Sequence, residues 1–473
     1  MLLKRLEVTV QVLVVVVAGL FLGYRGVQPL VFRVPHGNEM VLHQVLTARV
    51  IESGGSHNPW VPHWGGGAAV LQFSGHLAYL LSACLSGLVG LFGGSSDETV
   101  VVVNALFLAL LPAAVWMGMR GLGLRRWAAT AGAVAVLLVE ADRSQTLLQG
   151  AQTRCFTWEG AGLMPRLLAL VFSFVSLGSS APYIASGRGS FFLATLAAAL
   201  VWLSHYGVAY GTSLLLLAAA VAAGDPRALG RWLLLHAAVA AALLYAIVPA
   251  WLEWPVLSRT FAQPLQYWQS LSLRAALKLL LAGRLFDFVP ETHVRLQTPW
   301  FTVLVLCSVA WLAVRLLWAA AVQRRRPAAP LAAMAALSAA ALLLFAGPSA
   351  LGKFVNLLPF GRSLVVFSQF FLHLHMMGVV LVGWFVAEML GAAVSGLSLL
   401  ESLASSSASA TASGRRAIKL VLLLVSIGSV AAMAGPHLWQ EAMQVGEVFF
   451  PVFFSQLTVR FFAGARRPAR AAH

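Results

Sequence analysis

Long apolar runs separated by short polar segments make up most of this chain. Runs such as VTVQVLVVVVAGLFLGY and WLLLHAAVAAALLYAIVPAW approach the roughly 20 apolar residues with which a helix crosses a hydrocarbon core about 30 Å thick. The pattern therefore predicts an all-α, polytopic transmembrane protein. Spans are expected near residues 8–24, 99–119, 127–141, 162–180, 190–204, 207–223, 232–250, 299–319, 329–347, 363–390 and 417–435.

One more apolar stretch, residues 68–93, is long enough to span, and the positions of the arginines decide against it. If this stretch does not cross and the N-terminus is inside, the basic groups between spans fall on the cytoplasmic side, as short loops prefer. If it crosses, they all move outside. The polar residues within it also suit an interfacial or re-entrant helix buried against protein. The basic residues concerned are Arg120, Arg125, Arg126, Arg188, Arg227, Arg231, Arg324, Arg325, Arg326, Arg415, Arg416 and Lys419.

The predicted organisation is a transmembrane domain over residues 1–435 with about eleven spans and a cytoplasmic N-terminus. Its first outer loop, residues 25–98, is long and contains the re-entrant or interfacial helix at 68–93. A short basic amphipathic tail occupies residues 436–473. Because most of the polar length is on the outer side, function is expected there.

Composition and charge exclude two classes of protein. Apolar residues make up 60% of the chain and charged residues 10%, whereas soluble domains have roughly 45–50% and about 25%. The net charge of +16 is spread in short groups between apolar runs, which is typical of topology signals and not of a nucleic-acid-binding surface. Cys84, Cys155 and Cys307 lack metal-like spacing and are interpreted as small apolar filler.

The first outer loop contains a candidate acid and base. Glu39 and His43 are four residues apart, so a helix would place them on one face. They are either a solvated pair on an amphipathic helix, or a general base or metal-binding carboxylate beside an imidazole. The following WVPHWGGG segment offers aromatic side chains and a flexible turn.

A second acidic segment connects two predicted spans. Asp142 and Glu159 lie near the membrane face, where a carboxylate is costly unless it is paired, hydrated or used. Arg143, Arg154 and Arg166 are available partners, so a structural salt bridge is as well supported as catalysis.

Later polar residues near the outer face have two interpretations each. His205 ends one span where the next begins, as a capping or core histidine or as part of a site. Arg362 follows a Pro-Phe-Gly turn, where it either snorkels to the interface or binds a phosphate in bidentate fashion. His373 and His375 are expected to make buried polar contacts and not a metal site.

The order of these features resembles the GT-C membrane glycosyltransferases, which take sugars from polyprenyl-phosphate donors. The resemblance is to the catalytic subunits of oligosaccharyltransferase and to the 6-pyruvoyl-tetrahydropterin synthase-related membrane proteins. It rests on GNEMVLHQVLTARVIESGG, NPWVPHWGGGAAVLQF, MRGLGLRR, TWEGAGLMPRLLALVFSF, LSH and LPFGRSLVVFSQF. The chain departs from the family in having Glu39 for the usual aspartate, no WWD-type motif and no large soluble domain after the last predicted helix.

The resemblance implies roles for particular residues. Glu39, with His43 beside it, takes the place of the first-loop catalytic acid, and Glu159, or else Asp142, takes the second acidic position. A divalent cation, Mg²⁺ or Mn²⁺, is expected at Glu39 and Glu159. The lipid phosphate is assigned to two further residues, Arg362 and His205.

The sequence therefore predicts a membrane glycosyltransferase that uses a polyprenyl-phosphate-linked sugar at the outer membrane face. The alternative is a non-catalytic transmembrane subunit or scaffold of a larger complex. A transporter or flippase is disfavoured because the spans are almost purely apolar and no internal repeat is evident. Expected partners are membrane lipids, the lipid-linked donor and other membrane proteins, without nucleic acid. The membrane would be the plasma membrane in a prokaryote or the endoplasmic reticulum in a eukaryote.

Overall fold

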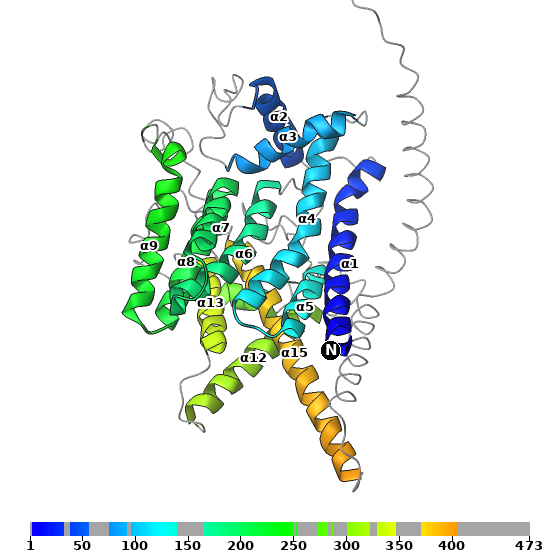
Figure 1. The fold of residues 1–473 in the computed structure, drawn as a ribbon, viewed down its shortest axis with the longest axis vertical. Coiled ribbons are helices and arrows are strands. Elements are labelled where there is room, and N and C mark those ends of the chain that lie inside the picture. Colours follow the sequence, from blue (N-terminus) through cyan, green and yellow to red (C-terminus); the bar gives the residue numbers. More distant parts are fainter. Residues whose placement is uncertain are drawn as a thin grey trace, which may run out of the picture.

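The chain is all-helical over the residues that its computed structural model describes, and no strand occurs among them (Figure 1). The described residues are 2–32, 38–55, 75–91, 96–139, 164–248, 252, 272–281, 286, 300–321, 329–346 and 370–404. The helices are α1 Leu2–Phe32, α2 Asn38–Glu52, α3 Leu77–Leu91, α4 Ser96–Gly121, α5 Arg126–Ala135 with the 3-10 turn η2 Val136–Leu138, α6 Met164–Ser186, α7 Phe191–Ser204, α8 Tyr206–Ala222, α9 Pro226–Ala242, α11 Leu273–Leu281, α12 Trp300–Ala321, α13 Ala329–Ala346 and α15 Phe371–Ala404.

Several of these helices are long and apolar enough to cross a membrane. Five meet that criterion among the described residues: Arg5–Tyr24, Glu98–Gly121, Met164–Ser186, Phe301–Ala321 and Leu372–Ala392. The predicted multi-pass integral membrane protein is therefore confirmed. The predicted number of about eleven spans is not, because the other described apolar helices are shorter and the span expected at 417–435 lies outside the described residues.

Several predicted spans differ in their bounds from the helices observed, and two of these differences have a local cause. The span expected at 127–141 is the ten-residue α5 followed by the η2 turn, after which Val139 is extended. The span expected at 232–250 begins earlier, at Pro226, because Asp225 caps the helix and proline suits its first position. Helix α9 ends at Ala242.

Close approach of small residues holds the first helices of the bundle together. A Cβ atom on Gly19 of α1 would overlap the carbonyl oxygen of Ala109 on α4, and one on Gly118 of α4 would overlap the Phe174 carbonyl of α6. In a membrane, where lipid tails are as apolar as leucine, such close backbone packing drives helix association. The positions of these small residues thus place α4 between α1 and α6 in the bundle.

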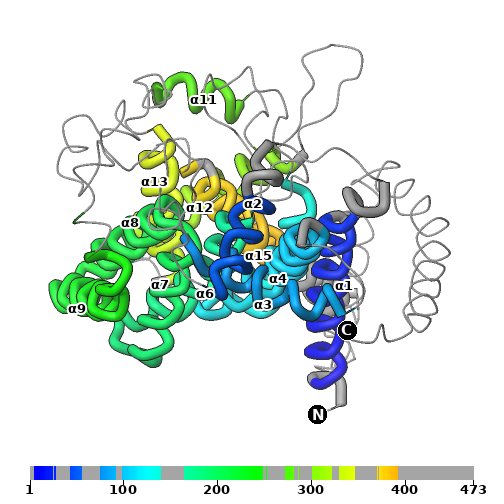
Figure 2. Tube along the Cα trace, turned by 90° about the horizontal axis from the view of Figure 1, so that it is seen from above, coloured from blue at the N-terminus to red at the C-terminus, as the bar shows by residue number. Residues whose placement is uncertain are grey.

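Helices α2 and α3 form a separate layer over one end of the bundle. In Figure 1 they lie above the upper ends of α4, α6 and α7, and seen from above in Figure 2 they lie over the bundle. Helix α3 covers 15 residues of the apolar stretch 68–93 and is not among the five long spans. The candidate site lies where this layer meets the helix ends beneath it.

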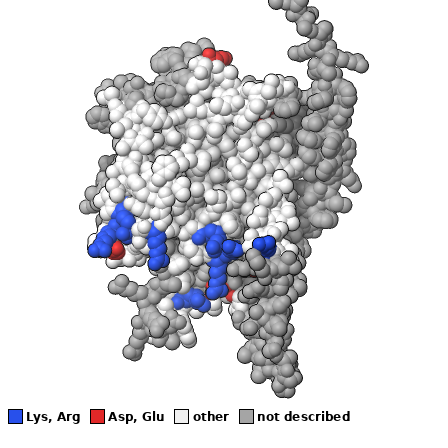
Figure 3. All heavy atoms as spheres, in the orientation of Figure 1, with Lys and Arg blue, Asp and Glu red and all other residues white. Residues whose placement is uncertain are grey.

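Arginines gather at the opposite end. Figure 3 shows Lys and Arg side chains along the lower part of the face drawn, below a wide surface without charges. The described connections α4–α5, α6–α7 and α8–α9, with the helix ends beside them, supply such residues: Arg120, Arg125, Arg126, Arg188, Arg227 and Arg231. They share one end because successive helices run in opposite directions.

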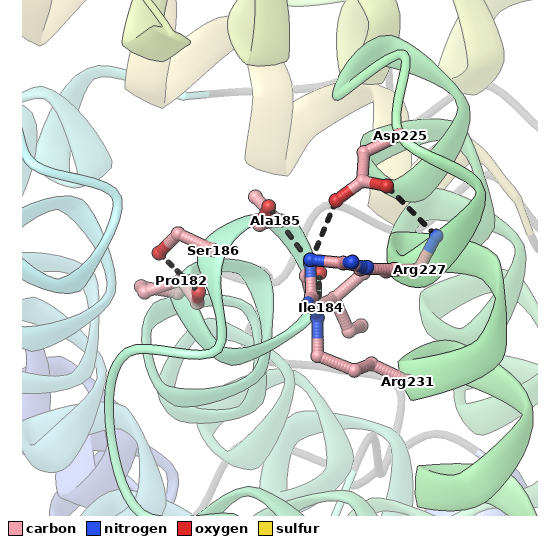
Figure 4. Close-up of polar contacts among 7 residues, drawn as sticks. All are labelled: Pro182, Ile184, Ala185, Ser186, Asp225, Arg227 and Arg231. Atoms are coloured by element: carbon pink, nitrogen blue, oxygen red, sulfur yellow. Dashed lines mark hydrogen bonds and ion pairs between the residues drawn. The ribbon is translucent and has the colours of Figure 1, made fainter.

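One of these arginines closes a helix end. The Arg231 Nε–H group donates to the Ile184 carbonyl at 2.7 Å and its NH2 group to the Ala185 carbonyl at 3.1 Å, at the C-terminus of α6 (Figure 4). Asp225, the cap of α9, lies 3.6 Å from the same guanidinium. A cation is favourable where the last carbonyls of a helix lack partners, so Arg231 ties α9 to α6.

Candidate functional site

His205 is the single residue between α7 and α8, at the apex of a helical hairpin. Ser204 ends α7 and Tyr206 begins α8, and the extended backbone of His205 (φ −163°, ψ 116°) turns the chain between them. Its Nδ1 atom accepts a hydrogen bond from the Val208 amide at 3.3 Å. The structural interpretation of His205 as a capping histidine is therefore confirmed, and the same geometry places its ring at the end of the bundle opposite the arginines of the short connections.

Arg166 joins His205 from the first turn of α6. The Arg166 Nε atom lies 3.4 Å from His205 Nε2. Burial, together with the charge of Arg166 and the neighbouring rings of His43 and His373, lowers the pKa of His205 to about 3. The imidazole is therefore neutral at physiological pH, because a second positive charge beside the guanidinium is unfavourable.

The layer above contributes two histidine–tyrosine pairs. His43 of α2 is 8% exposed, and its Nδ1 atom lies 2.8 Å from the Tyr79 hydroxyl of α3. The His76 Nε2 atom lies 3.2 Å from the hydroxyl of Tyr245, which follows α9. These contacts join α2, α3 and the chain after α9 over the end of the bundle.

A series of buried polar contacts continues below His205. The His373 Nε2 atom of α15 lies 3.0 Å from the Val208 carbonyl and 3.3 Å from the Thr212 hydroxyl, both on α8. The Thr212 hydroxyl in turn lies 2.8 Å from the Ser173 hydroxyl of α6. The buried polar contact predicted for His373 is confirmed. His375 is also fully buried and packs against Phe286, with ring centroids 5.2 Å apart.

Of the predicted site residues, His43 and His205 lie near enough to each other for their charges to interact. The interpretation of His43 as part of a solvated pair is wrong, because its ring is buried between α2 and α3. Glu39 lies in the first turn of α2, one turn before His43. The structure describes its backbone but not its side chain. Asp142, Glu159 and Arg362 also lie outside them, so their roles stay predictions.

The predicted divalent cation likewise stays a prediction. No three His, Cys, Asp or Glu side chains come together as a metal site within the part of the chain that is described. The described histidines at this end are hydrogen-bonded to tyrosine, threonine or backbone groups. The predicted ligands, Glu39 and Glu159, are not among the described side chains.

Sequence reasoning missed the tyrosines and hydroxyl groups of this region. Tyr79, Tyr245, Thr212 and Ser173 lie within apolar stretches, and their spacing alone does not indicate partners. The sequence offers Arg166 as a partner for a carboxylate, but in the structure it contacts His205. A polar residue within an apolar stretch near a helix end was the available signal, because such groups are usually paired or functional.

Comparisons with known proteins find similarity in structure only. No family model and no curated protein matches the chain. The chain is similar to the crystal structure of the oligosaccharyltransferase of Archaeoglobus fulgidus in its apo form, at 13% identity and a TM-score of 0.48, over 90% of this chain and 55% of that one. It is also similar to the archaeal oligosaccharyltransferase AglB from Archaeoglobus fulgidus in complex with an inhibitory peptide and a dolichol-phosphate, at 12% identity and a TM-score of 0.47, over 90% of this chain and 55% of that one. The chain thus spans about half the length of these two proteins.

Proposed function

We propose that the protein transfers a sugar from a polyprenyl-phosphate-linked donor at the membrane face that carries α2 and α3. The observation that carries the proposal is the separation of polar groups along the bundle. Arg166 and His205 lie beneath the α2–α3 layer, to which His43 belongs, whereas the arginines of the short connections lie at the other end (Figure 3). If those arginines are cytoplasmic, as short basic loops prefer, the candidate site faces outward.

The reaction requires a base for the acceptor and positive charge for the leaving phosphate. In the proposed step, an acceptor oxygen or nitrogen attacks the anomeric carbon of the sugar and the bond from that carbon to the phosphate oxygen breaks. The proton of the acceptor passes to the Glu39 carboxylate, and the polyprenyl phosphate leaves with the bonding electrons. General-base catalysis and electrostatic stabilisation of the leaving group together supply the rate acceleration.

The position of Glu39 supports its role as base. Glu39 precedes His43 by one turn of α2, and residues four apart share a helix face. The face that carries His43 packs on Tyr79 and lies close to His205. Arg362 is proposed as a further contact of the donor phosphate, as the family resemblance implies, and Glu159 or Asp142 as the second acid.

The test is donor turnover in reconstituted membranes, with a radiolabelled polyprenyl-phosphate hexose as probe. Glu39→Gln should abolish consumption of the lipid-linked sugar, since the amide cannot accept the proton. Glu52→Gln is the matched control, because Glu52 lies in the same helix and is 60% exposed in a pair with Arg49. Full turnover by Glu39→Gln would reject the base. No turnover by the wild-type protein, despite correct insertion, would favour the non-catalytic subunit instead.

A further inference from the structure

Both ring nitrogens of His205 face N–H donors, and a neutral imidazole cannot accept a hydrogen bond at both nitrogens. Its Nδ1 atom faces the Val208 N–H at 3.3 Å and its Nε2 atom faces the Arg166 Nε–H at 3.4 Å. A neutral imidazole has only one nitrogen free to accept, so it cannot accept from both groups at once. Whichever nitrogen carries the proton, two N–H groups face each other. Both distances are longer than the 2.9–3.0 Å at which N–H···O hydrogen bonds most often form.

The cap decides which nitrogen is protonated. Val208 occupies the third position of α8, whose amide needs a side-chain acceptor at the preceding cap. If Nδ1 accepts there, the proton is on Nε2 and the Nε2–H group points toward Arg166. Two donors, one of them a guanidinium, then converge on the same space without an acceptor between them.

The surroundings favour negative charge in that space. Arg166 has no ion pair with a carboxylate, and its terminal NH2 groups have no hydrogen-bond partner, within the part of the chain that is described. The N-termini of α6 and α8, at Met164 and Tyr206, both lie at this end. Helix N-termini carry partial positive charge and offer unpaired N–H groups, which is why they bind phosphates.

We infer that Arg166 and His205 form a clamp for a phosphate oxyanion, which accepts hydrogen bonds from the Arg166 guanidinium and from His205 Nε2–H. The ligand is the phosphate of the polyprenyl-linked donor, and this assignment of the ligand rests on the proposed function. A phosphate oxygen beside this pair, within reach of both side chains, resolves the conflict, because each donor gains an acceptor while Nδ1 keeps the cap of α8.

The clamp predicts a particular dependence on residue type. The planar guanidinium can hold two phosphate oxygens at once, whereas an ammonium group acts as a point charge. Asparagine at position 205 can still cap α8 but cannot direct an imidazole N–H at the ligand. Arg166→Gln and His205→Asn therefore remove the clamp and keep the α7–α8 hairpin. Arg166→Lys keeps the positive charge but lacks the planar group that can hold two phosphate oxygens.

The test is equilibrium binding to the full-length protein purified in a phosphate-free maltoside detergent. A radiolabelled polyprenyl phosphate is the probe, and inorganic phosphate and phosphatidylglycerol are the competitors. Arg166→Gln and His205→Asn should each raise Kd at least tenfold, and Arg166→Lys by less. Arg188→Gln, at the exposed turn between α6 and α7 at the other end of the bundle, is the control and should leave Kd unchanged. Size-exclusion chromatography identifies any variant that has failed to fold.

Each outcome is decisive. Unchanged affinity in folded Arg166→Gln and His205→Asn overturns the clamp. Phosphatidylglycerol that competes as well as polyprenyl phosphate, with the same loss in both variants, supports an oxyanion clamp and overturns its assignment to the donor. Because no turnover is measured, wild-type binding that is lost in the variants stands even if Glu39→Gln remains active, so failure of the clamp and failure of the proposed reaction are distinguished.

Discussion

The Nδ1 atom of His43 lies 2.8 Å from the hydroxyl oxygen of Tyr79, and this contact joins α2 to α3. Both residues are buried: 8% of the surface of His43 and 2% of the surface of Tyr79 are exposed. A buried polar pair of this kind is favourable only while both partners are present. The contact therefore fixes the rotation of α2, the helix that also carries Glu39, relative to the rest of the layer.

Replacement of Tyr79 by phenylalanine should loosen α2. The change removes the hydroxyl beside His43 Nδ1, so local opening of α2 should become easier by about 1–2 kcal/mol. Hydrogen–deuterium exchange of the α2 amides measures this. The control is Tyr183→Phe, since the Tyr183 ring packs against Phe191 with centroids 5.4 Å apart and its hydroxyl bonds no described residue. Equal protection of α2 in wild-type and Tyr79→Phe proteins would contradict the role given to this pair.

A methyl group at Gly75 should displace the apex of the α7–α8 hairpin. A Cβ atom there would overlap the Ser204 carbonyl and approach the His205 amide, and both are backbone groups that cannot rotate away. Overpacking of this kind costs about 1–3 kcal/mol, so Gly75→Ala should lower Tm in detergent and weaken donor binding. The matched control is Gly87→Ala in α3, where a Cβ atom meets open space. That variant should be neutral or slightly stabilised by about 0.5–1 kcal/mol. A Tm of Gly75→Ala equal to that of the control would count against the close contact.

Removal of the Arg231 side chain should destabilise the end of α6. Arg231→Ala loses the two hydrogen bonds to the Ile184 and Ala185 carbonyls and the contact with Asp225 (Figure 4). The partly exposed ion pair contributes little by itself, so the expected cost of about 1–2 kcal/mol comes mainly from the helix carbonyls left without a partner. Thermal unfolding followed by circular dichroism measures the change. Arg227→Ala, an exposed arginine one turn earlier in α9, serves as the control. Similar Tm values for the two variants would refute the capping role.

Acidification should reveal the neutral state of His205. Its folded pKa is lowered to about 3, whereas an unfolded histidine has a pKa of about 6.5. Below pH 6.5 the unfolded chain takes up a proton that the folded protein does not, so this residue destabilises the fold as pH falls from 6.5 toward 3.

The measurement is the loss of Tm between pH 7 and pH 5. His205→Asn keeps the cap of α8 but does not titrate, so its Tm should fall less than that of the wild-type protein over this interval. Identical pH profiles of the two proteins would show that His205 does not have the lowered pKa.

The sequence determined the class of the protein and the general course of its chain. Apolar runs in the described part form helices, and the arginines of three short connections lie at one end (Figure 3). Both results follow from one-dimensional patterns, because span length and loop charge depend only on local composition. Helix bounds were less accurate, as at α9, because caps and turns move a helix end without changing hydropathy. The number of spans and the location of the second acidic group stay predictions.

Only the tertiary structure decided which polar side chains meet. His43 and Tyr79 are 36 residues apart, and Arg166 and His205 are 39 apart. Whether such residues face each other depends on the rotation and vertical register of the helices that carry them. Rotation and register are set by tertiary contacts, such as the contact of Gly75 with the hairpin apex. Hydropathy is nearly uniform around a buried transmembrane helix, so it does not encode these two quantities. The candidate acid could therefore be proposed from the sequence, but the pairing of Arg166 with His205 required the fold.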